Sequence, residues 1–488
     1  MKTRRKLFSK DKMNVGNILL IGFIFYGSIS SDAQTKTWSL KACIDTAFKK
    51  NISLNQGQLT SQTNQINLVQ SKAAALPNLN LSDGHNFNSG YSLDPYTYQY
   101  TNQTFSTNNL SLNSSVTLFN GYLLLNTVKQ NKLIYEAGNL DVEKIKNDIT
   151  LNVLAGYMQV LMDYEAIDVA QAQVDATNTQ VEQTKKFVEF GKVAELNLLQ
   201  IQSQLASDKL TKVNAENQLQ LDKITLLQLM ETPATKDFDI ERQELKELFP
   251  EIPLSTEEID KISESFLPQI KSASLKTNAA LFGLKVAESG WFPKLTMSGA
   301  LKTGYSSMKS NITQITSYNS ETIGYLNGNS ADPVIGMVPN TIINKQNDPL
   351  SDQFKNNFNQ VIGVTLSVPI FNNLQVKTNI EIAKINVLSA KLNEQQTKND
   401  LRKSIETAYT NQVSAGKKLI ATEEQMALEK RTYSDMEKKF NVGAINATDF
   451  LIEKNNFNKV SMSLIQAKYD YVLKTKMVDF YLGKPLTF

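Results

Sequence analysis

Side chains that carry covalent or metal chemistry are scarce in this sequence of 488 residues. His85 and Cys43 are its only histidine and cysteine, so a Cys/His metal cluster or a Cys–His or Ser–His nucleophile has no support. The neighbouring carboxylates Glu257–Glu258 and Glu423–Glu424 lie in helical patterns and are typical of exposed helix faces. The scattered glycines form no phosphate-binding loop. We therefore expect no enzyme activity, no cofactor and no bound metal.

The lone histidine and cysteine have structural interpretations. Cys43 lies within a helical pattern and is expected to be a buried helix residue. The segment Leu40–Cys43 is similar to a lipoprotein cleavage box, but it lies well past the apolar N-terminal run. His85 falls on the apolar side of an alternating segment, which predicts a residue on a barrel surface or in an interface. A single cysteine also excludes an internal disulfide.

The composition is that of a folded protein with long helices. Hydrophobic residues make up 41% and charged residues 20% of the chain, which separates it from disordered sequences. Its 21 glycines and 12 prolines are about half the usual share, so helix breakers are few. The net charge of +3, from 51 basic and 48 acidic residues, gives no basic field and predicts no nucleic-acid partner.

The N-terminus predicts export. Basic residues between Lys2 and Lys12 precede an apolar stretch over 15–29, and small residues follow at 31–33. This order is typical of a secretory signal peptide over residues 1–33, with Gln34 as the mature start. An N-terminal membrane anchor is the alternative, but the apolar run is shorter than the roughly 18 to 20 residues that span a bilayer. If the protein enters a membrane, we expect it to do so with strands.

The chain contains an internal repeat. Gly443 follows Gly191 by 252 residues, and Ile370–Asn373 follows the similar Leu118–Gly121 by the same 252. Pro293, by contrast, follows its counterpart Pro77 by only 216 residues. The second copy therefore carries 36 extra residues between Pro293 and Ile370.

The repeat predicts a common layout for the two halves, joined by a charged, proline-containing linker over 232–253. The expected elements of the first half, 34–231, are helices within 38–76, strands 78–91 and 105–118, and helices 121–190 and 195–230. Those of the second half, 254–488, are helices within 255–290, strands 294–305 and 360–370, and helices 373–441 and 446–482.

The longest helices should form supercoiled pairs. The segment 121–190 has no proline and would extend about 100 Å as a continuous helix, so the molecule should be elongated. Apolar residues recur in it at seven-residue intervals, which favours a left-handed coiled coil. An isolated coiled-coil rod would show the same pattern. The repeated positions are Val153, Val160, Ile167, Val174, Val181 and Val188, with Ile405, Gln412, Leu419, Met426, Tyr433 and Phe440 in the second half. Gln412 interrupts the apolar seam, so we expect it to snorkel or to face water.

Four shorter segments alternate strictly between apolar and polar residues, as in Leu79 and Leu81 between asparagines. Such segments are typical of a transmembrane β-barrel with a polar lumen, although a half-buried sheet alternates likewise. Four strands cannot close a barrel, and an open edge in lipid leaves backbone groups unsatisfied. We therefore expect the barrel to be shared, with three chains giving twelve strands. The loops 91–100 and about 306–359 should face outside, the second holding the extra residues.

These features together resemble the TolC family of outer-membrane efflux and secretion channels. The resemblance covers residues 36 to 488 and rests on the tandem layout, the Leu118–Gly121 hairpin ending, the Gly443 turn followed by Asp449–Leu451, the opening helix from Trp38 and the close at Tyr481–Leu486. It implies a homotrimer in the outer membrane of a Gram-negative bacterium, in contact with lipid, with a mainly helical periplasmic barrel below a twelve-strand β-barrel. It also implies a periplasmic adaptor and an inner-membrane transporter as partners.

The resemblance also assigns roles to the turns. Gly191 and Gly443 would lie at the periplasmic tip, where glycine allows the chain to reverse and adaptor hairpins dock.

The family narrows its periplasmic entrance with inward acidic residues, and Asp449 matches the first such position. The second position is Ile452 here, so the acidic pair is incomplete, with Glu453 one residue further on. Asn197 occupies the equivalent place in the first half. Alternatively, Asp449 is a solvated carboxylate at a helix start, where it is favourable for the helix dipole.

The sequence thus predicts a passive exit duct of a tripartite efflux pump or type I secretion system, opened by an adaptor. A secreted coiled-coil filament is the alternative, and the signal peptide and duplicated strand pairs argue against it. A periplasmic adaptor would need a single helical hairpin rather than two copies of this plan.

Overall fold

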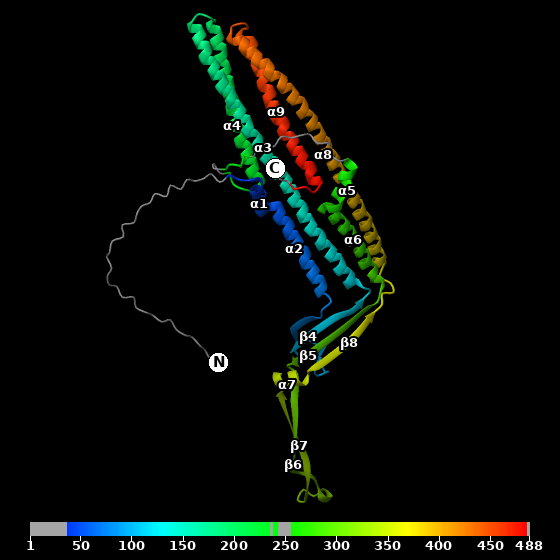
Figure 1. The fold of residues 1–488 in the computed structure, drawn as a ribbon. Coiled ribbons are helices and arrows are strands. Elements are labelled where there is room, and N and C mark those ends of the chain that lie inside the picture. Colours follow the sequence, from blue (N-terminus) through cyan, green and yellow to red (C-terminus); the bar gives the residue numbers. More distant parts are fainter. Residues whose placement is uncertain (1–36, 235–237, 243–254, 486–488) are drawn as a thin grey trace, which may run out of the picture.

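The computed structural model describes residues 37–234, 238–242 and 255–485. The expected signal peptide, 1–33, and most of the expected linker lie outside these residues. Figure 1 shows an elongated molecule, with the long helices at one end and the strands at the other. The elongation follows from two unbroken helices of 67 residues each, each about 100 Å long.

The elements of the first half begin with two short helices and end with two long ones. They are α1 (Leu40–Lys50), α2 (Ile52–Ala73), β1 (Asn78–Asn88), β2 (Ser92–Leu93), β3 (Tyr100–Thr101), β4 (Phe105–Asn120), α3 (Leu123–Glu189) and α4 (Glu195–Leu229).

The second half repeats this order with insertions between its strands. Its elements are α5 (Thr256–Phe266), α6 (Pro268–Glu288), η1 (Ser289–Trp291), β5 (Lys294–Ser306), β6 (Ser310–Tyr325), η2 (Leu326–Gly328), β7 (Pro333–Asn347), α7 (Leu350–Asn356), β8 (Asn359–Ser367), α8 (Gln375–Asn441) and α9 (Ala447–Tyr481). The bounds of α8 and α9 follow those of α3 and α4 by 252 residues, the same spacing as in the sequence repeat.

The chain passes from sheet to long helix through the same backbone turn in both halves. Gly121 and Tyr122 have φ of 64° and 65°, and Asn373 and Leu374 have φ of 54° and 62°. Two successive left-handed residues reverse the chain sharply, which costs energy at every residue except glycine. Gly121 is also required sterically, because a Cβ there would lie 2.6 Å from Cβ of Phe292.

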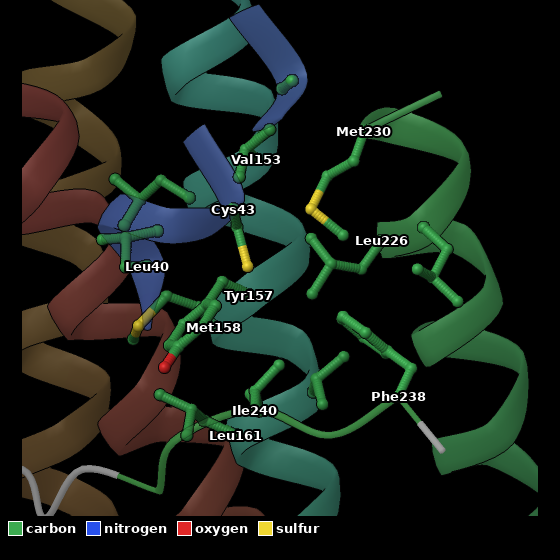
Figure 2. Close-up of a cluster of buried hydrophobic side chains, with 14 of the residues drawn as sticks. Leu40, Cys43, Val153, Tyr157, Met158, Leu161, Leu226, Met230, Phe238 and Ile240 are labelled. Atoms are coloured by element: carbon green, nitrogen blue, oxygen red, sulfur yellow. The ribbon is translucent and has the colours of Figure 1, made fainter. Parts of the chain in front are cut away.

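The largest apolar core lies where α1, α3 and α4 meet (Figure 2). Cys43 and Tyr157 are fully buried in it, which confirms the prediction for the cysteine. Burial raises the pKa of the Cys43 thiol to about 12, so the thiol stays protonated and unreactive. The segment expected to be a charged linker contributes two side chains, Phe238 and Ile240, that are also buried here.

The long helices pack through the predicted seven-residue seams. Val153, Val160 and Leu419 are buried in them. Gln412 is buried as well, with 6% of its surface exposed, so the expectation that it faces water was wrong. Its amide nitrogen lies 3.4 Å from Oγ1 of Thr475 on α9, a partner that only the folded pair of helices supplies. Among the helices that the structure describes, none is long and apolar enough to cross a membrane.

The four predicted strand segments form one antiparallel sheet in the order β1-β4-β5-β8. Apolar residues lie next to one another across it, as in the row Leu81, Leu112 and Leu301. Adjacent rows such as Ser82, Ser111 and Lys302 are polar. Because successive side chains point to opposite faces, the sheet has one apolar and one polar face. A bulge near Leu118 interrupts the register and places Phe119 opposite Leu295.

The region expected to be a long loop over 306–359 is not a loop. It contains the antiparallel hairpin β6–β7 and the short helix α7. Figure 1 shows this hairpin extending from the sheet away from the helices. Comparison of the two halves of the sequence did not predict this hairpin, because the first half has only the two-residue strands β2 and β3 at the corresponding place.

Candidate functional site

The two helical hairpins, α3–α4 and α8–α9, end in tips that lie side by side at one end of the molecule (Figure 1). Gly191 and Gly443 form the turns with φ of 67° and 76°. The Gly191 nitrogen donates to the Val188 carbonyl at 2.9 Å, and the Gly443 nitrogen donates to the Phe440 carbonyl at 2.9 Å. Such hydrogen bonds end a helix when the residue just past it, here the glycine, adopts the left-handed conformation. The same residue type therefore ends both helices for the same reason.

A surface hollow of about 480 Å³ opens between these tips. Both hairpins contribute to its lining, which includes Asn197 from the first and Gly443 and Asp449 from the second. Its other lining residues are Thr184, Phe187, Lys192, Val193, Phe440, Ala444, Ile445 and Asn446. The fold thus brings together two predicted aperture residues that are 252 positions apart in the sequence.

Asp449 is exposed and held by its neighbour at the start of α9. The Asn446 side chain accepts a hydrogen bond from the Asp449 nitrogen at 2.8 Å and donates one to the Asp449 carboxylate at 2.9 Å. The first bond satisfies an orphan backbone N–H group at the helix N-terminus, and the second joins the two side chains. The carboxylate is therefore fixed in place while still facing the hollow.

Glu453 has a different environment from Asp449. It is not among the residues that line the hollow. One oxygen of its carboxyl group is enclosed, and so is one oxygen of Glu429 on α8. Burial, followed by the charge and hydrogen bonding of Glu429, raises the pKa of Glu453. An aperture role for Glu453 stays a prediction. Ile452, the residue before it, is largely exposed.

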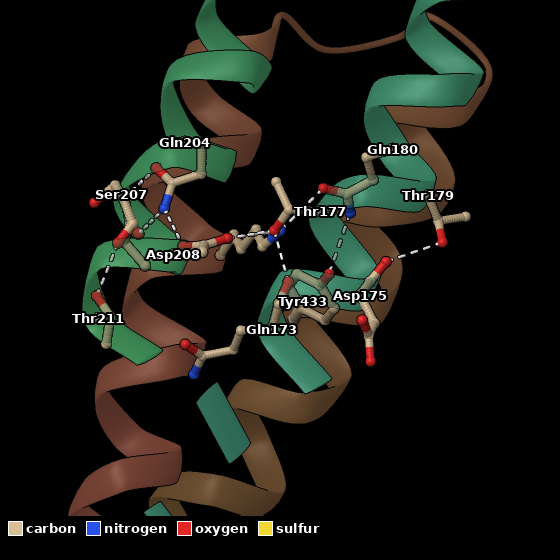
Figure 3. Close-up of polar contacts among 12 residues, drawn as sticks. Gln173, Asp175, Thr177, Thr179, Gln180, Gln204, Ser207, Asp208, Thr211 and Tyr433 are labelled. Atoms are coloured by element: carbon tan, nitrogen blue, oxygen red, sulfur yellow. Dashed lines mark hydrogen bonds and ion pairs between the residues drawn. The ribbon is translucent and has the colours of Figure 1, made fainter. Parts of the chain in front are cut away.

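A buried polar network, which the sequence did not reveal, ties the two hairpins together below the tips (Figure 3). Lys454 of α9 is 2% exposed, and its ammonium group lies 3.8 Å from the carboxylate of Asp208 on α4. It donates to Gln180 of α3 at 3.1 Å and to the Thr177 hydroxyl. The Thr177 hydroxyl in turn donates to Asp208. One α9 side chain thereby contacts both helices of the other hairpin.

The network is costly to open because its members are almost fully buried. Thr177, Gln180 and Asp208 are 0%, 5% and 4% exposed. Burial lowers the pKa of Lys454, and the nearby Asp208 charge opposes that effect. The sequence signal was weak, because a lysine in a helix more often reaches solvent along its aliphatic stem.

The apolar face of the sheet is exposed in a single chain. Leu81, Leu301 and Val364 are 69%, 42% and 61% exposed. His85 is exposed on β1 and makes an edge-on contact with Phe87, with ring centroids 4.8 Å apart. The histidine is thus on the apolar surface, as predicted. A band of exposed apolar side chains on one face and Asn, Ser and Thr on the other suits lipid on one side and water on the other.

Comparison with known protein families identifies the chain. The family model described as "Outer membrane efflux protein" matches residues 43–231 and 267–484. The chain belongs to the outer membrane efflux protein family. The match covers most of both halves and leaves out residues 232–266 between them.

Individual relatives agree with the family. The chain is 22% identical over 429 residues to the outer membrane protein TolC of Vibrio cholerae, covering 85% of this chain and 84% of that one. It is 22% identical over 374 residues to the toxin and drug export protein A of Aggregatibacter actinomycetemcomitans, covering 74% and 69%.

Solved structures share the fold. The CusC channel superposes with a TM-score of 0.73 at 16% identity, covering 94% of this chain and 96% of that one. The outer membrane protein VceC of Vibrio cholerae gives 0.71 at 14% identity, covering 92% and 97%. The predicted fold class, long helices forming a periplasmic part and strands forming a β part in two repeats, is confirmed. As a member of this outer membrane efflux protein family, the protein is an outer-membrane protein of a Gram-negative bacterium with a large periplasmic helical part.

Proposed function

We propose that three copies of this chain form a passive exit duct that conducts substrates from the periplasm to the exterior when a periplasmic adaptor opens it. The duct serves a tripartite efflux pump or a type I secretion system, and an inner-membrane transporter supplies the energy. The observation that carries the proposal is a four-stranded sheet with one apolar face and two open edges.

The open edges require neighbouring chains. β1 and β8 each have a strand on one side only within the described part of the chain. In lipid, such an edge leaves backbone groups without partners at a cost of several kcal/mol each. A closed ring in which β1 of one copy pairs with β8 of the next satisfies every edge, and three copies supply twelve strands.

The helices have open edges in the same places. α2 packs on α3, α3 on α6 and α6 on α8, so α2 and α8 border the helical layer as β1 and β8 border the sheet. Both carry exposed apolar residues: Leu59 and Ile66 on α2 are 61% and 66% exposed, and Ile385 and Leu392 on α8 are 63% and 71% exposed. Each pair is spaced by seven residues, which suits a coiled-coil seam with a neighbouring copy.

The tips provide the adaptor contact and the aperture. The hollow between them presents Asp449 and Asn197 beside two glycine turns. An adaptor that binds the splayed tips better than the closed ones shifts the equilibrium toward the open duct. The names of two relatives, a toxin and drug export protein and a TolC protein, support this class of function.

Extraction of the outer membrane with mild detergent, followed by native mass determination, tests the assembly. We expect a mass of three chains. A monomer recovered from the soluble periplasm would overturn the proposal.

Asp449→Ala tests the aperture. Loss of a ring of fixed carboxylates is expected to raise the basal conductance of the duct in planar bilayers several-fold, because the aperture loses its charged, ordered side chains. Asp435→Ala is the matched control, since Asp435 is an exposed carboxylate of α8 outside the hollow. Equal conductance for Asp449→Ala and the control would remove Asp449 from the aperture.

A further inference from the structure

The polar face of the four-stranded sheet carries positive charge and no negative charge. The cross-strand register places two lysines of β5 on this face, Lys302 in a row with Ser111 and Lys294 in a row with Asn120. Both lysines are exposed in the single chain. Every other residue of β1, β4, β5 and β8 that shares the polar face is uncharged. Asp83, the one carboxylate within these four strands, lies on the apolar face.

The neighbours of Lys302 on the polar face offer it no charge. The hydroxyls of Ser82 and Ser111 share a hydrogen bond at 2.6 Å, and Asn113 donates to the Ser111 hydroxyl at 3.0 Å. On its other side Lys302 lies opposite Asn359, another uncharged residue. The charge of the Lys302 ammonium group is therefore available to a solute that passes along this face.

The segment between β1 and β4 folds over the same face just beyond Lys302. A Cβ at Gly304 would overlap the hydroxyl of Tyr96, so the glycine makes room for this tyrosine against the sheet. Asp94 of the same segment is fully buried, and its carboxylate accepts hydrogen bonds from the Ser306 hydroxyl and the Tyr96 nitrogen. A solute at this narrowed end of the sheet therefore passes beside the lysine, whereas the carboxylate is enclosed.

We propose that the lumen of the β-barrel selects for anionic solutes through two rings of lysine, one of Lys294 and one of Lys302. This inference rests on the proposed trimer, which places both lysines of each of the three chains on the wall of the lumen. Rings of basic side chains are a means by which pores favour anions. The substrate class assigned to the duct is therefore anionic.

The dimensions of the barrel make these charges effective. Twelve strands about 4.8 Å apart and tilted by about 40° close a wall about 12 Å from the axis. The four-carbon stem of lysine carries the ammonium group from the wall toward the axis. Because the Debye length is about 8 Å at physiological ionic strength, a solute on the axis is attracted by all three ammonium groups of a ring.

The two rings act at different depths. Lys294 and Lys302 are eight residues apart on β5, which is about 20 Å along the axis of a tilted strand. A passage lined by one sign of charge raises the local concentration of the opposite ion. An anion is therefore attracted at both ends of the barrel and is held strongly at neither.

Ion selectivity of the full-length trimer in planar bilayers tests the proposal. The reversal potential under a KCl gradient gives the ratio of chloride to potassium permeability. Every protein carries Asp449→Asn, so that carboxylates at the tips do not mask the charge of the barrel. We expect chloride to be more permeant than potassium. Lys294→Gln combined with Lys302→Gln should lower the permeability ratio about threefold, because both rings lose their charge.

Two further variants control for the change of charge. Lys302→Glu converts the outer ring to carboxylates and should lower the permeability ratio further than Lys302→Gln. Lys41→Gln removes the same charge from an exposed position on α1, outside the sheet. It should leave the permeability ratio unchanged.

Native mass determination on the same preparations separates this inference from the proposed function. A conducting trimer in which the double lysine variant and Lys41→Gln have equal permeability ratios overturns the anion selectivity and leaves the duct standing. A preference for potassium in the protein that carries only Asp449→Asn has the same consequence. The absence of a trimer or of any conductance overturns both.

Discussion

The α3–α4 and α8–α9 hairpins have equal lengths and equivalent turns, but they lie in different surroundings. α3 buries 17 of its 67 residues and α8 buries 10 of 67. Leu140 of α3 is half-buried, whereas its counterpart Leu392, 252 residues later, is 71% exposed. The cause is the layer order: α3 packs between α2 and α6, whereas α8 packs on α6 and α9 and borders the helical layer, which leaves the part around Leu392 exposed.

The difference shows that duplication preserved the backbone and left the surroundings free to diverge. In the first half, the surface of the long helix is covered by the chain itself. In the second half, the equivalent surface still carries apolar residues. Their burial stabilises the protein only if another copy covers them. Four tests, from the largest expected effect to the smallest, break or sharpen this comparison.

Lys454→Ala removes the side chain that joins the two hairpins. The buried carboxylate of Asp208 is then left without its cation, and breaking such a pair costs about 3–5 kcal/mol of unfolding free energy. Chemical denaturation followed by helical circular dichroism measures it. Lys459→Ala, an exposed lysine of the same helix, should cost almost nothing. Replacing both partners, with Lys454→Met and Asp208→Leu, should recover most of the loss, and failure to recover would show that packing rather than charge is decisive.

Asp163→Asn tests a position where the two halves differ in chemistry, since Ala415 stands at the equivalent place in α8. Asp163 is 4% exposed, and burial together with the neighbouring Asp222 raises its pKa to about 7. An acid whose pKa is raised by folding binds a proton in the folded state that the unfolded state has lost. Between pH 4 and 7 the unfolding free energy should therefore fall by about 1.4 kcal/mol per pH unit on account of this group.

The Asp163→Asn variant has no titratable group at this position, so it does not take up the extra proton on folding. Its stability relative to the unsubstituted chain should rise steadily from pH 4.5 to 6.5, measured by denaturation at each pH. A constant difference between the two proteins over this range would contradict the raised pKa.

Leu392→Asp places a charge in the open apolar stripe of α8. Burial of a leucine contributes about 1.5–3 kcal/mol, so the fraction of dissociated chains in detergent should rise more than tenfold by native mass determination. Asn386→Asp changes an exposed residue away from the stripe and should leave the assembly intact. Equal behaviour of the two variants would show that this stripe faces no other copy.

Gly191→Ala and Gly443→Ala test the equivalence of the two tips. A Cβ at either position would meet nothing within 4 Å, so only the left-handed backbone carries a cost, about 1 kcal/mol. The two variants should lower the thermal midpoint by similar small amounts. A much larger effect at one tip would reveal a contact that the other lacks.

Several features could be predicted from the sequence because they depend on local patterns. Seven-residue periodicity and the scarcity of proline predicted the long helices, and the glycine turns predicted where these helices end. The alternation of apolar and polar residues predicted the four strands of the sheet. The joint position of Asn197 and Asp449 at the tip followed from the repeat.

Other features escaped prediction because their signals are distributed. The partners of Lys454 come from two helices more than 240 residues earlier in the chain, and nothing local marks the lysine as buried. Phe238 and Ile240 belong to a charged segment, yet both are buried in the core, where the backbone of Ile240 pairs with that of Trp38. The β6–β7 hairpin has no counterpart in the first half, so the repeat could not reveal it.

The sequence by itself determined the period of the helices, the two faces of the sheet and the positions at which the chain reverses, because each depends on residues that are neighbours along the chain. Only the tertiary structure decided which side of each helix is covered, which charges are buried together and which apolar faces are left open. Those properties depend on segments far apart in the sequence, whose distances are fixed only when the layers pack.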